Sequence, residues 1–223
     1  MGLATKQLTK TNTTMKNHTK LAVAFLAAAS SIAAQAADAP AAFTGAGNIA
    51  LTSDYVFRGA SQTAGKTALQ GGYDVTHASG FSAGLWASNV SDALGGLEID
   101  LYANYGFKLG VFDVSVGYIN YTYNTAANGG EANLAVTYAG LTLKYSDGVS
   151  GALSDYYYEA NYSYDVPSVK GLNLGLHYGQ TETKVYDYAI AVSYPVLGFT
   201  GTVSYSDLEA GKSITAVTLK KVF

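Results

Sequence analysis

Few side chains in this sequence could do chemistry, and several of them are spaced at even intervals. Arg58 is the only arginine and follows Asp54 by four residues, while Glu98 and Asp100 are two residues apart. In an extended strand, residues at even spacing share a face. An arginine beside carboxylates on such a face would form a rigid ion-pair network, because its planar fork matches a carboxylate. An arginine that projects freely would instead bind an anionic solute; we favour the network.

The histidines give little support for catalysis. Outside residues 1–36 the sequence holds only His77, at a tight turn, and His177, alone on the polar face of a predicted strand. A barrel lipase needs a serine and a histidine together near the lipid-facing wall, and His177 lies on the opposite face. Carboxylate pairs such as Glu98 and Asp100 are also common polar filling of a barrel. We therefore expect no enzyme, no cofactor and, from the spacing, no metal site.

The stretch 97–108 shows the kind of element that positions these residues. One face carries Leu, Ile, Leu, Ala, Tyr and Phe, and the other carries Glu, Asp, Tyr, Asn, Gly and Lys. This period of two predicts a β-strand with one apolar and one polar face. Strands of soluble domains usually have about five or six residues, whereas a tilted strand of about 9–11 residues crosses a bilayer.

The composition is typical of a membrane-spanning sheet. Of the 223 residues, 48% are hydrophobic and 13% are charged, with 25 Gly, 19 Tyr and no Cys. The charged fraction is about half that of an average soluble domain, and tyrosine is enriched where a membrane meets water. The lack of cysteine excludes disulfides and thiol chemistry. Beyond the N-terminus, no apolar run approaches the roughly 18 residues of a spanning helix.

The N-terminus predicts a secretory signal peptide over residues 1–36. A basic start precedes an apolar segment at 21–29, and the sequence AQA at 34–36 matches an A-x-A cleavage site. Met15 is a more natural start than the first residue, and a retained signal anchor is the alternative. Cleavage would remove four of the 13 basic residues and none of the 16 acidic ones, which leaves a formal charge of −7. Such an acidic chain is a poor nucleic-acid binder.

Twelve segments of the remaining chain, residues 37–223, alternate in the same way. The predicted strands are 47–57, 67–76, 81–89, 97–108, 112–123, 132–138, 141–145, 155–164, 172–178, 186–194, 199–205 and 213–223. Connections after even-numbered strands are mostly tight, and those after odd-numbered strands are mostly longer and more polar. This asymmetry is typical of an outer-membrane barrel, with short periplasmic turns and longer outer loops. Because twelve is even, we expect both termini on the periplasmic side.

The last predicted strand ends on Phe223, with Val217 and Leu219 on the same face. A terminal Phe on an alternating strand resembles the signal that the outer-membrane assembly machinery reads, so that machinery is an expected partner. Lys221 occupies a place on this face where an apolar residue would be usual. We interpret it as a lysine that extends its amino group to the interface.

A soluble β-sandwich is the alternative fold, because its strands also alternate and are also separated by turns every 8–12 residues or so. The solvent faces of a sandwich usually carry Lys, Glu and Thr. Here the faces opposite the apolar ones carry mainly Gly, Ala, Ser, Thr and Asn, with few charges. We therefore favour the barrel.

The alternation assigns eleven charged residues to the barrel interior, seven acidic and four basic. The candidate pore-lining residues are Asp54, Arg58, Asp74, Glu98, Asp100, Lys108, Asp113, Lys144, Glu159 and Asp187, together with Lys220. An acidic interior would mildly favour cations, because the charges that line a channel set its selectivity. The alternative is that these charges pair with one another, which we favour for any single residue.

Small residues recur on the interior faces. They are Gly72, Gly84, Gly117, Gly175, Ala189, Ala191 and Ser193. A twelve-stranded barrel lined in this way has room for a passage, whereas eight strands are filled by their own side chains. The longest predicted loops have about eight residues, so we expect a partial constriction at most and no substantial plug. Trp86 and the tyrosine rows could stack sugars, but outward tyrosines are more typical of an interfacial girdle.

Four blocks of sequence carry a family resemblance. They are SDYVFRGASQT from Ser53, ALQGGYD from Ala68, GLWASNV from Gly84 and EIDLY from Glu98, with a further SYSD at Ser204. In this order and spacing they resemble the TorF family of porins, a proteobacterial group formerly described as conserved hypothetical exported proteins. The likeness covers essentially the whole chain after the signal peptide. It implies an outer-membrane barrel with channel activity, and it does not indicate which substrate passes.

The sequence thus predicts an all-β, transmembrane, antiparallel up-and-down barrel of about twelve strands, in contact with outer-membrane lipids of a Gram-negative cell. The expected function is passive diffusion of small hydrophilic solutes or ions, with a mild preference for cations. The alternative is a closed structural or adhesive barrel that acts through its loops. A lipid-modifying enzyme is a third hypothesis, and it would require an essential Ser or His.

Overall fold

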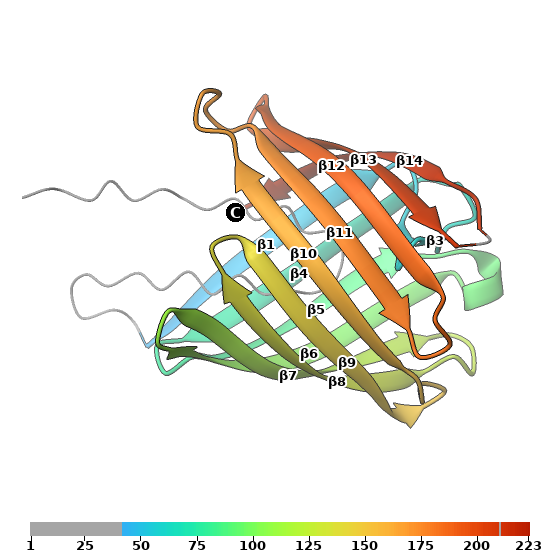
Figure 1. Cartoon of the computed structure of the whole chain (residues 1–223). Helices are drawn as coiled ribbons and strands as arrows, with labels where there is room; N and C mark the ends of the chain where they lie inside the picture. The colour runs from blue at the N-terminus through green and yellow to red at the C-terminus, as the bar shows by residue number, and fades with distance from the viewer. Residues whose placement is uncertain (1–41, 210) are drawn as a thin grey trace, which may run out of the picture.

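The computed structural model describes residues 42–209 and 211–223. Twelve strands form one closed antiparallel barrel, and a two-stranded hairpin forms a separate small sheet (Figure 1). The predicted signal peptide, residues 1–36 with Met15, lies outside the described residues. Within the described residues, no helix is long and apolar enough to span a membrane.

The barrel strands have 9 to 13 residues each. They are β1 (Phe43–Thr52), β4 (Ala68–His77), β5 (Phe81–Asn89), β6 (Leu97–Leu109), β7 (Phe112–Tyr123), β8 (Gly129–Tyr138), β9 (Leu141–Gly151), β10 (Tyr156–Asp165), β11 (Asn173–Thr181), β12 (Tyr186–Val196), β13 (Phe199–Leu208) and β14 (Ile214–Val222). The hairpin consists of β2 (Val56–Phe57) and β3 (Ala60–Ser61), and a 3-10 helix spans Asp92–Leu94. Strands β4 to β14 pair in chain order, and β1 closes the barrel by pairing with both β4 and β14.

The prediction of a twelve-stranded antiparallel barrel is confirmed, and two of the strands, 81–89 and 112–123, match in both bounds. Several others are longer than predicted. β9 continues to Gly151, whereas the apolar alternation ends at Tyr145. Its second half pairs with β8 through the backbone, which requires no apolar side chains.

The first strand differs most from its prediction. The predicted strand 47–57 begins earlier in the structure, at Phe43, and ends at Thr52. Its early part pairs with β4 as far as His77, although its small residues give no alternation. Arg58 and Gly59 both have a left-handed backbone, with φ of 48° and 76°. This conformation is incompatible with an extended strand and forms the turn of the hairpin, while the chain leaves the barrel wall earlier, after Thr52.

Both ends of the described barrel lie on the side of the tight turns. There, Gly47 and Phe223 exchange backbone hydrogen bonds of 2.8 and 3.0 Å. Four of the five connections on this side have two or three residues, and the fifth is the longer segment 166–172. The hairpin β2–β3 lies at the opposite end, with the longer loops (Figure 1).

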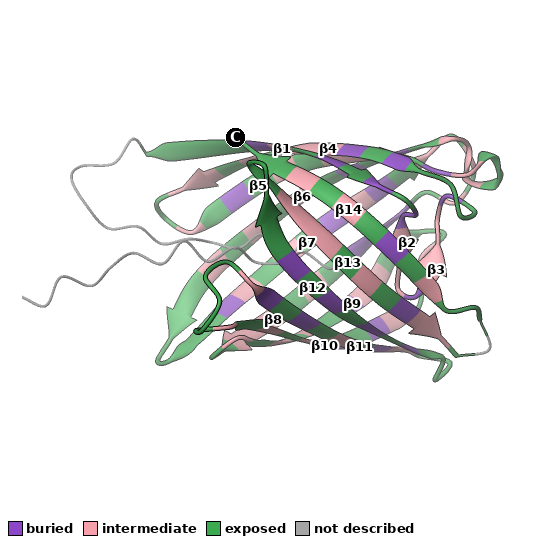
Figure 2. Cartoon of the chain, turned by 90° about the horizontal axis from the view of Figure 1, so that it is seen from above, coloured by how far each residue is buried: buried purple, intermediate pink, exposed green. Residues whose placement is uncertain are grey.

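The outer surface of the barrel is apolar. Buried and exposed residues alternate along the strands (Figure 2), and the exposed ones in the strand centres are aliphatic. More than half of the surface of each of these side chains is exposed: Leu51, Leu101, Leu143, Ile190, Val203 and Val217. Large aliphatic side chains are normally buried in soluble proteins, so a continuous exposed band of them fits contact with lipid.

Aromatic side chains border this apolar band at both ends. On the tight-turn side, Phe81 packs against Tyr105 with ring centroids 4.7 Å apart, and Phe112 packs against Tyr138 at 5.5 Å. On the loop side, tyrosine pairs occur at 145/156, 178/186 and 188/205. Two aromatic belts around an apolar band are typical of barrels that cross a membrane.

Candidate functional site: the charged barrel interior

The segment 53–67, which carries the hairpin β2–β3, folds into the barrel at the loop end (Figure 2). Asp54 fixes its shape, because its Oδ1 accepts hydrogen bonds from the hydroxyls of Ser61 (2.6 Å) and Thr63 (2.7 Å). The Thr63 hydroxyl in turn accepts the backbone N–H of Tyr55 at 3.1 Å. The segment is longer than the eight-residue loop expected from the sequence, since the predicted first strand contributes residues to it.

A small apolar cluster packs one side of this segment against the barrel wall. Tyr55 is buried together with Ala68 and Val90, and Trp86 packs edge-on against its ring with centroids 5.4 Å apart. Burial raises the pKa of the Tyr55 hydroxyl well above its ordinary value, so this side chain stays neutral. Trp86 is thus part of the packing between segment and wall.

Arg58 joins the segment to the opposite wall of the barrel. Its Nη1 and Nη2 donate to the two oxygens of Glu131 on β8, at 2.8 and 2.9 Å. Its guanidinium carbon lies 4.1 Å from the ring centroid of Tyr157 on β10 and 4.8 Å from that of Phe57. Burial alone would lower the pKa of Arg58, but the hydrogen-bonded pair with Glu131 outweighs it and the pKa is raised. The arginine therefore joins one carboxylate in a bidentate ion pair, rather than the several expected.

Glu131 turns inward with the regular alternation of β8, which it shares with Asn133 and Ala135. The pairing of β8 with β9 shifts register beside it, since Gly130 pairs with Ser150 and Glu131 with Gly148, and the extra residue of this bulge lies on β9. The Tyr121 hydroxyl on β7 donates to the second Glu131 oxygen at 3.2 Å. The glutamate side chain is only 3% exposed, against 22% for Arg58, so the carboxylate belongs to the wall and the arginine reaches it from the interior.

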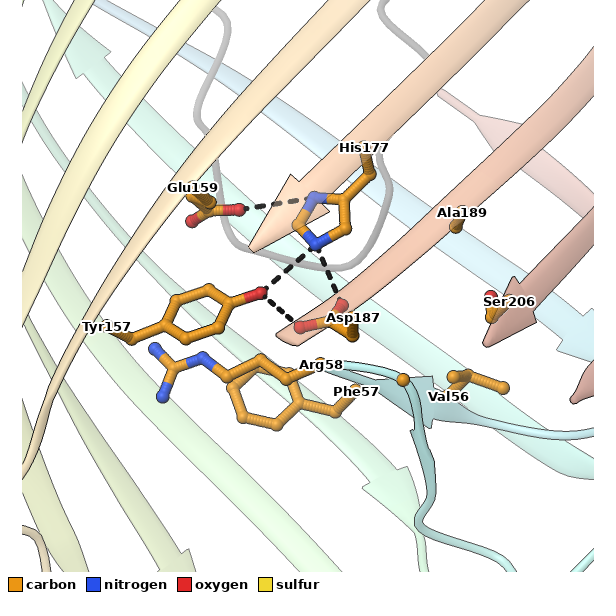
Figure 3. Close-up of a pocket in the computed structure, with 10 residues that line it drawn as sticks. Val56, Phe57, Arg58, Tyr157, Glu159, His177, Asp187, Ala189 and Ser206 are labelled. Carbon is orange, nitrogen blue, oxygen red and sulfur yellow. Dashed lines mark hydrogen bonds and ion pairs between the residues drawn. The ribbon is translucent and has the colours of Figure 1, made fainter. Parts of the chain in front are cut away.

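His177 on β11 joins side chains from the two neighbouring strands (Figure 3). Its Nε2 lies 2.9 Å from Asp187 and 3.1 Å from the Tyr157 hydroxyl, which itself donates to Asp187 at 2.7 Å. Its Nδ1 lies 2.7 Å from Asn161 and 3.6 Å from Glu159. The expectation that His177 lies alone was therefore wrong, because strand pairing brings partners that the sequence does not reveal.

Glu98 and Asp100 lie side by side on β6 and are 1% and 5% exposed. The Tyr123 hydroxyl donates to Glu98 at 2.6 Å. One oxygen of each carboxylate, Oε2 of Glu98 and Oδ1 of Asp100, has no protein hydrogen-bond partner. Among the predicted interior carboxylates, these two are thus the ones with a buried oxygen that lacks a protein partner.

The other predicted charges are distributed along the barrel. Asp74 accepts from the Tyr102 hydroxyl at 2.6 Å, and Lys144 lies 3.5 Å from Glu159 across the β9–β10 pair. Lys108 and Asp113 pair with each other at 2.5 Å beside the β6–β7 turn. Their side chains are 66% and 59% exposed, so this pair lies at the barrel end, away from the buried network.

The interior glycines make room for neighbouring side chains. A Cβ on Gly84 would lie 2.6 Å from the ring of Tyr102, and one on Gly117 would lie 1.9 Å from Asn104. Beside the segment, a cavity of about 50 Å³ remains, lined by Arg58, Tyr157 and the His177 group (Figure 3). A water molecule needs about 10–15 Å³ of such volume, so this space admits only a few waters.

Sequence reasoning missed two residues of this site, Glu131 and Tyr157. Glu131 follows two glycines and lies one residue before the predicted strand 132–138, although it shares the even spacing of Asn133 and Ala135 on β8. Tyr157 lies between two outward tyrosines of β10. The alternation of the strand therefore predicts that its side chain points inward, and this could have identified it. Within the described chain, no group of three or more His, Cys, Asp or Glu side chains is arranged to hold a metal ion.

The architecture defines a class: a closed twelve-stranded antiparallel barrel of the porin type, with an apolar wall and a charged interior. A family model described as a bacterial protein of unknown function, Gcw_chp, matches residues 34–221. The chain belongs to this family. No curated protein matches the sequence with significance.

Solved porin structures share the fold at low sequence identity. A KdgM porin aligns with a TM-score of 0.58 and 14% identity, over 79% of this chain and 96% of the porin. A KdgM porin in complex with disordered oligogalacturonate gives 0.56 and 14%, over 80% and 97%. A NanC porin gives 0.50 and 11%, over 80% and 98%.

Proposed function

We propose that the protein is an outer-membrane channel for small hydrophilic solutes and ions, with a preference for cations. The observation that carries the proposal is the excess of negative charge inside the barrel. Seven carboxylates have inward positions, and three bases accompany them. The acids are Asp54, Asp74, Glu98, Asp100, Glu131, Glu159 and Asp187, and the bases are Arg58, Lys144 and Lys220.

Four further observations support the proposal. The exposed aliphatic band between two aromatic belts fits a barrel set in lipid, and the porin fold of the neighbours fits a channel. The resemblance of the segment 53–102 to TorF-family porins points the same way. Short turns at the end that carries both termini fit a periplasmic orientation of that end.

The oligogalacturonate named for the KdgM complex is a polyanion, which an acidic interior would repel. We therefore infer that a polyanion of this kind is not the solute of this barrel. Lining charge sets the selectivity of channels, so the sign of the interior charge is the property to measure.

A planar-bilayer experiment under a KCl gradient tests this function. We expect discrete current steps and a reversal potential that indicates preference for K⁺ over Cl⁻. In Glu98→Gln/Asp100→Asn, the reversal potential should shift toward zero, because the two carboxylates with an oxygen that lacks a protein partner are neutralised. The control is Asp113→Asn, which lies at the barrel end beside Lys108. Equal shifts in both variants, or none, would remove Glu98 and Asp100 from the conducting path.

A closed structural or adhesive barrel is the second candidate. One observation favours it: the segment 53–67 crosses the interior and is held to the far wall through Arg58 and Glu131. A folded protein that never conducts would support this reading. Loss of adhesion on removal of the loop-side connections would then identify the contact surface.

A further inference from the structure

The ion pair between Arg58 and Glu131 has the form of a ligand in a binding site. We propose that Glu131, Tyr121 and Tyr157 form a site for the guanidinium group of a cationic solute, which Arg58 occupies as a tethered ligand. The proposal names a solute class for the channel proposed above and rests on that function for transport. Binding itself can be measured separately.

The site recognises a guanidinium by both its edge and its face. Glu131 accepts two parallel hydrogen bonds, at 2.8 and 2.9 Å, and this bidentate geometry discriminates a planar fork from an ammonium group. The Tyr157 ring lies 4.1 Å from the guanidinium carbon, within the range of cation–π contact. A sodium ion or a primary amine could satisfy only part of this arrangement.

The site is preformed in the barrel wall. Tyr121 holds Glu131 at 3.2 Å, and Asp187 and His177 hold the Tyr157 hydroxyl at 2.7 and 3.1 Å. None of these three hydrogen-bonding partners belongs to the segment 53–67. The carboxylate and the ring therefore keep their orientation when the arginine leaves, as a binding site for a diffusing solute requires.

The tethered arginine is the less firmly held partner. Arg58 has a left-handed backbone, with φ of 48°, which is unfavourable for a non-glycine residue. The two short strands of its hairpin pair with each other through two residue pairs, 56/61 and 57/60. Departure of Arg58 would leave the charge of Glu131 buried, and a buried carboxylate without a cation is strongly disfavoured. A second cation would therefore be drawn into its place.

The adjoining cavity defines the rest of the solute. It lies beside Arg58 and is lined by Glu159, Asp187 and His177. Two carboxylates there disfavour a solute that carries its own carboxylate close to the guanidinium. The site thus fits a short alkylguanidinium cation, and it should reject acidic solutes.

Isothermal titration calorimetry of the folded barrel with ethylguanidinium tests the proposal. We expect Arg58→Ala to bind ethylguanidinium at least about tenfold more tightly than the wild type, because no tethered ligand has to be displaced first. Arg58→Ala/Glu131→Gln should lose this binding. Ethylammonium at the same ionic strength is the control solute and should bind Arg58→Ala much more weakly. Equal binding of ethylguanidinium by Arg58→Ala with and without Glu131→Gln would overturn the proposal.

Two further measurements keep the test decisive. If Arg58→Ala fails to fold, Arg58→Lys replaces it; it should also bind ethylguanidinium more tightly than the wild type, and equal affinity would contradict the proposal. Fluorescence of Trp86, the only tryptophan, should change in the wild type on ethylguanidinium addition, because Trp86 packs on the displaced segment. A barrel that conducts but shows no Glu131-dependent binding refutes this inference alone. Binding without any conductance refutes the proposed function and leaves the site intact.

Discussion

Tyr157 connects the two halves of the interior network. Its ring faces the Arg58 guanidinium, and its hydroxyl bridges His177 and Asp187. The side chain is only 2% exposed, so both of its ends contact protein groups rather than bulk water. The ring and the hydroxyl therefore have separable roles, one toward the segment 53–67 and the other toward the wall.

Tyr157→Phe should destabilise the barrel by about 1–3 kcal/mol, because it leaves the buried partners of the hydroxyl unsatisfied. Tyr158→Phe is the matched control. Tyr158 is the next residue, 41% exposed on the outer surface, where its hydroxyl donates to Gln180. This change should stay within about 0.5 kcal/mol. Reversible urea unfolding in lipid vesicles measures both, and equal losses would contradict the account of Tyr157.

At the residue scale, alternation predicted which side chains turn inward, including Glu98, Asp100, Glu159 and Asp187. It could not predict their partners, because partners depend on the register between strands. His177 meets Asp187 only because residue 177 pairs with 189, and 179 with 187. Glu131 was missed for a different reason: two glycines stand just before it, so the alternation is not visible in the sequence until Ala132.

At the scale of the strand, glycines permit close cross-strand packing. Gly84 on β5 pairs with Tyr102 on β6, and the tyrosine ring lies over the glycine, held by its hydrogen bond to Asp74 at 2.6 Å. The inward face of these strands is thus filled by large side chains that lie across small ones.

Gly84→Ala should cost about 1–3 kcal/mol, since its Cβ would lie 2.6 Å from a ring that has little freedom to move. Gly71→Ala on neighbouring β4 is the control, because its Cβ would meet only the Asn48 carbonyl oxygen at 3.4 Å, an ordinary contact. Its effect should be within about 0.5 kcal/mol. Urea unfolding distinguishes the two variants. A Gly84→Ala barrel as stable as Gly71→Ala would show that Tyr102 is not fixed.

Strand number and order could be predicted from the sequence because lipid demands an apolar outward face on every strand. Strand ends could not, since beyond the lipid the outward face need not be apolar. The polar half of β9 shows this, and so does the early part of β1. The inward fold of 53–67 could not be predicted, because Asp54, Val56 and Arg58 continue the sequence alternation of the first strand. In the structure the backbone at Arg58 is left-handed rather than extended.

At the scale of the whole molecule, the apolar band fixes which face meets lipid. Leu101 lies in this band on β6, 56% exposed. Leu101→Arg should destabilise the barrel by about 2–4 kcal/mol if the residue faces the middle of a bilayer. The control is Leu197→Arg, at the β12–β13 turn and 95% exposed, which should be nearly neutral. Urea titration in vesicles compares them, and a neutral Leu101→Arg would reverse the orientation of the wall.

The interior of the molecule combines an acidic lining with a segment that narrows it. We propose that the lining favours passage of cations and that the segment 53–67, held through Arg58, limits the size of the solutes that pass. These two features together require that the barrel conducts ions and that the hairpin β2–β3 reduces the conductance.

Single-channel conductance in planar bilayers, compared between the wild type and a variant lacking residues 56–61, tests that account most directly. We predict small, discrete, cation-selective steps for the wild type. The deletion variant should give clearly larger steps with the same sign of selectivity, because the wall charges remain. Absence of conductance in both proteins, with each shown to be folded, would contradict the account and favour a closed barrel.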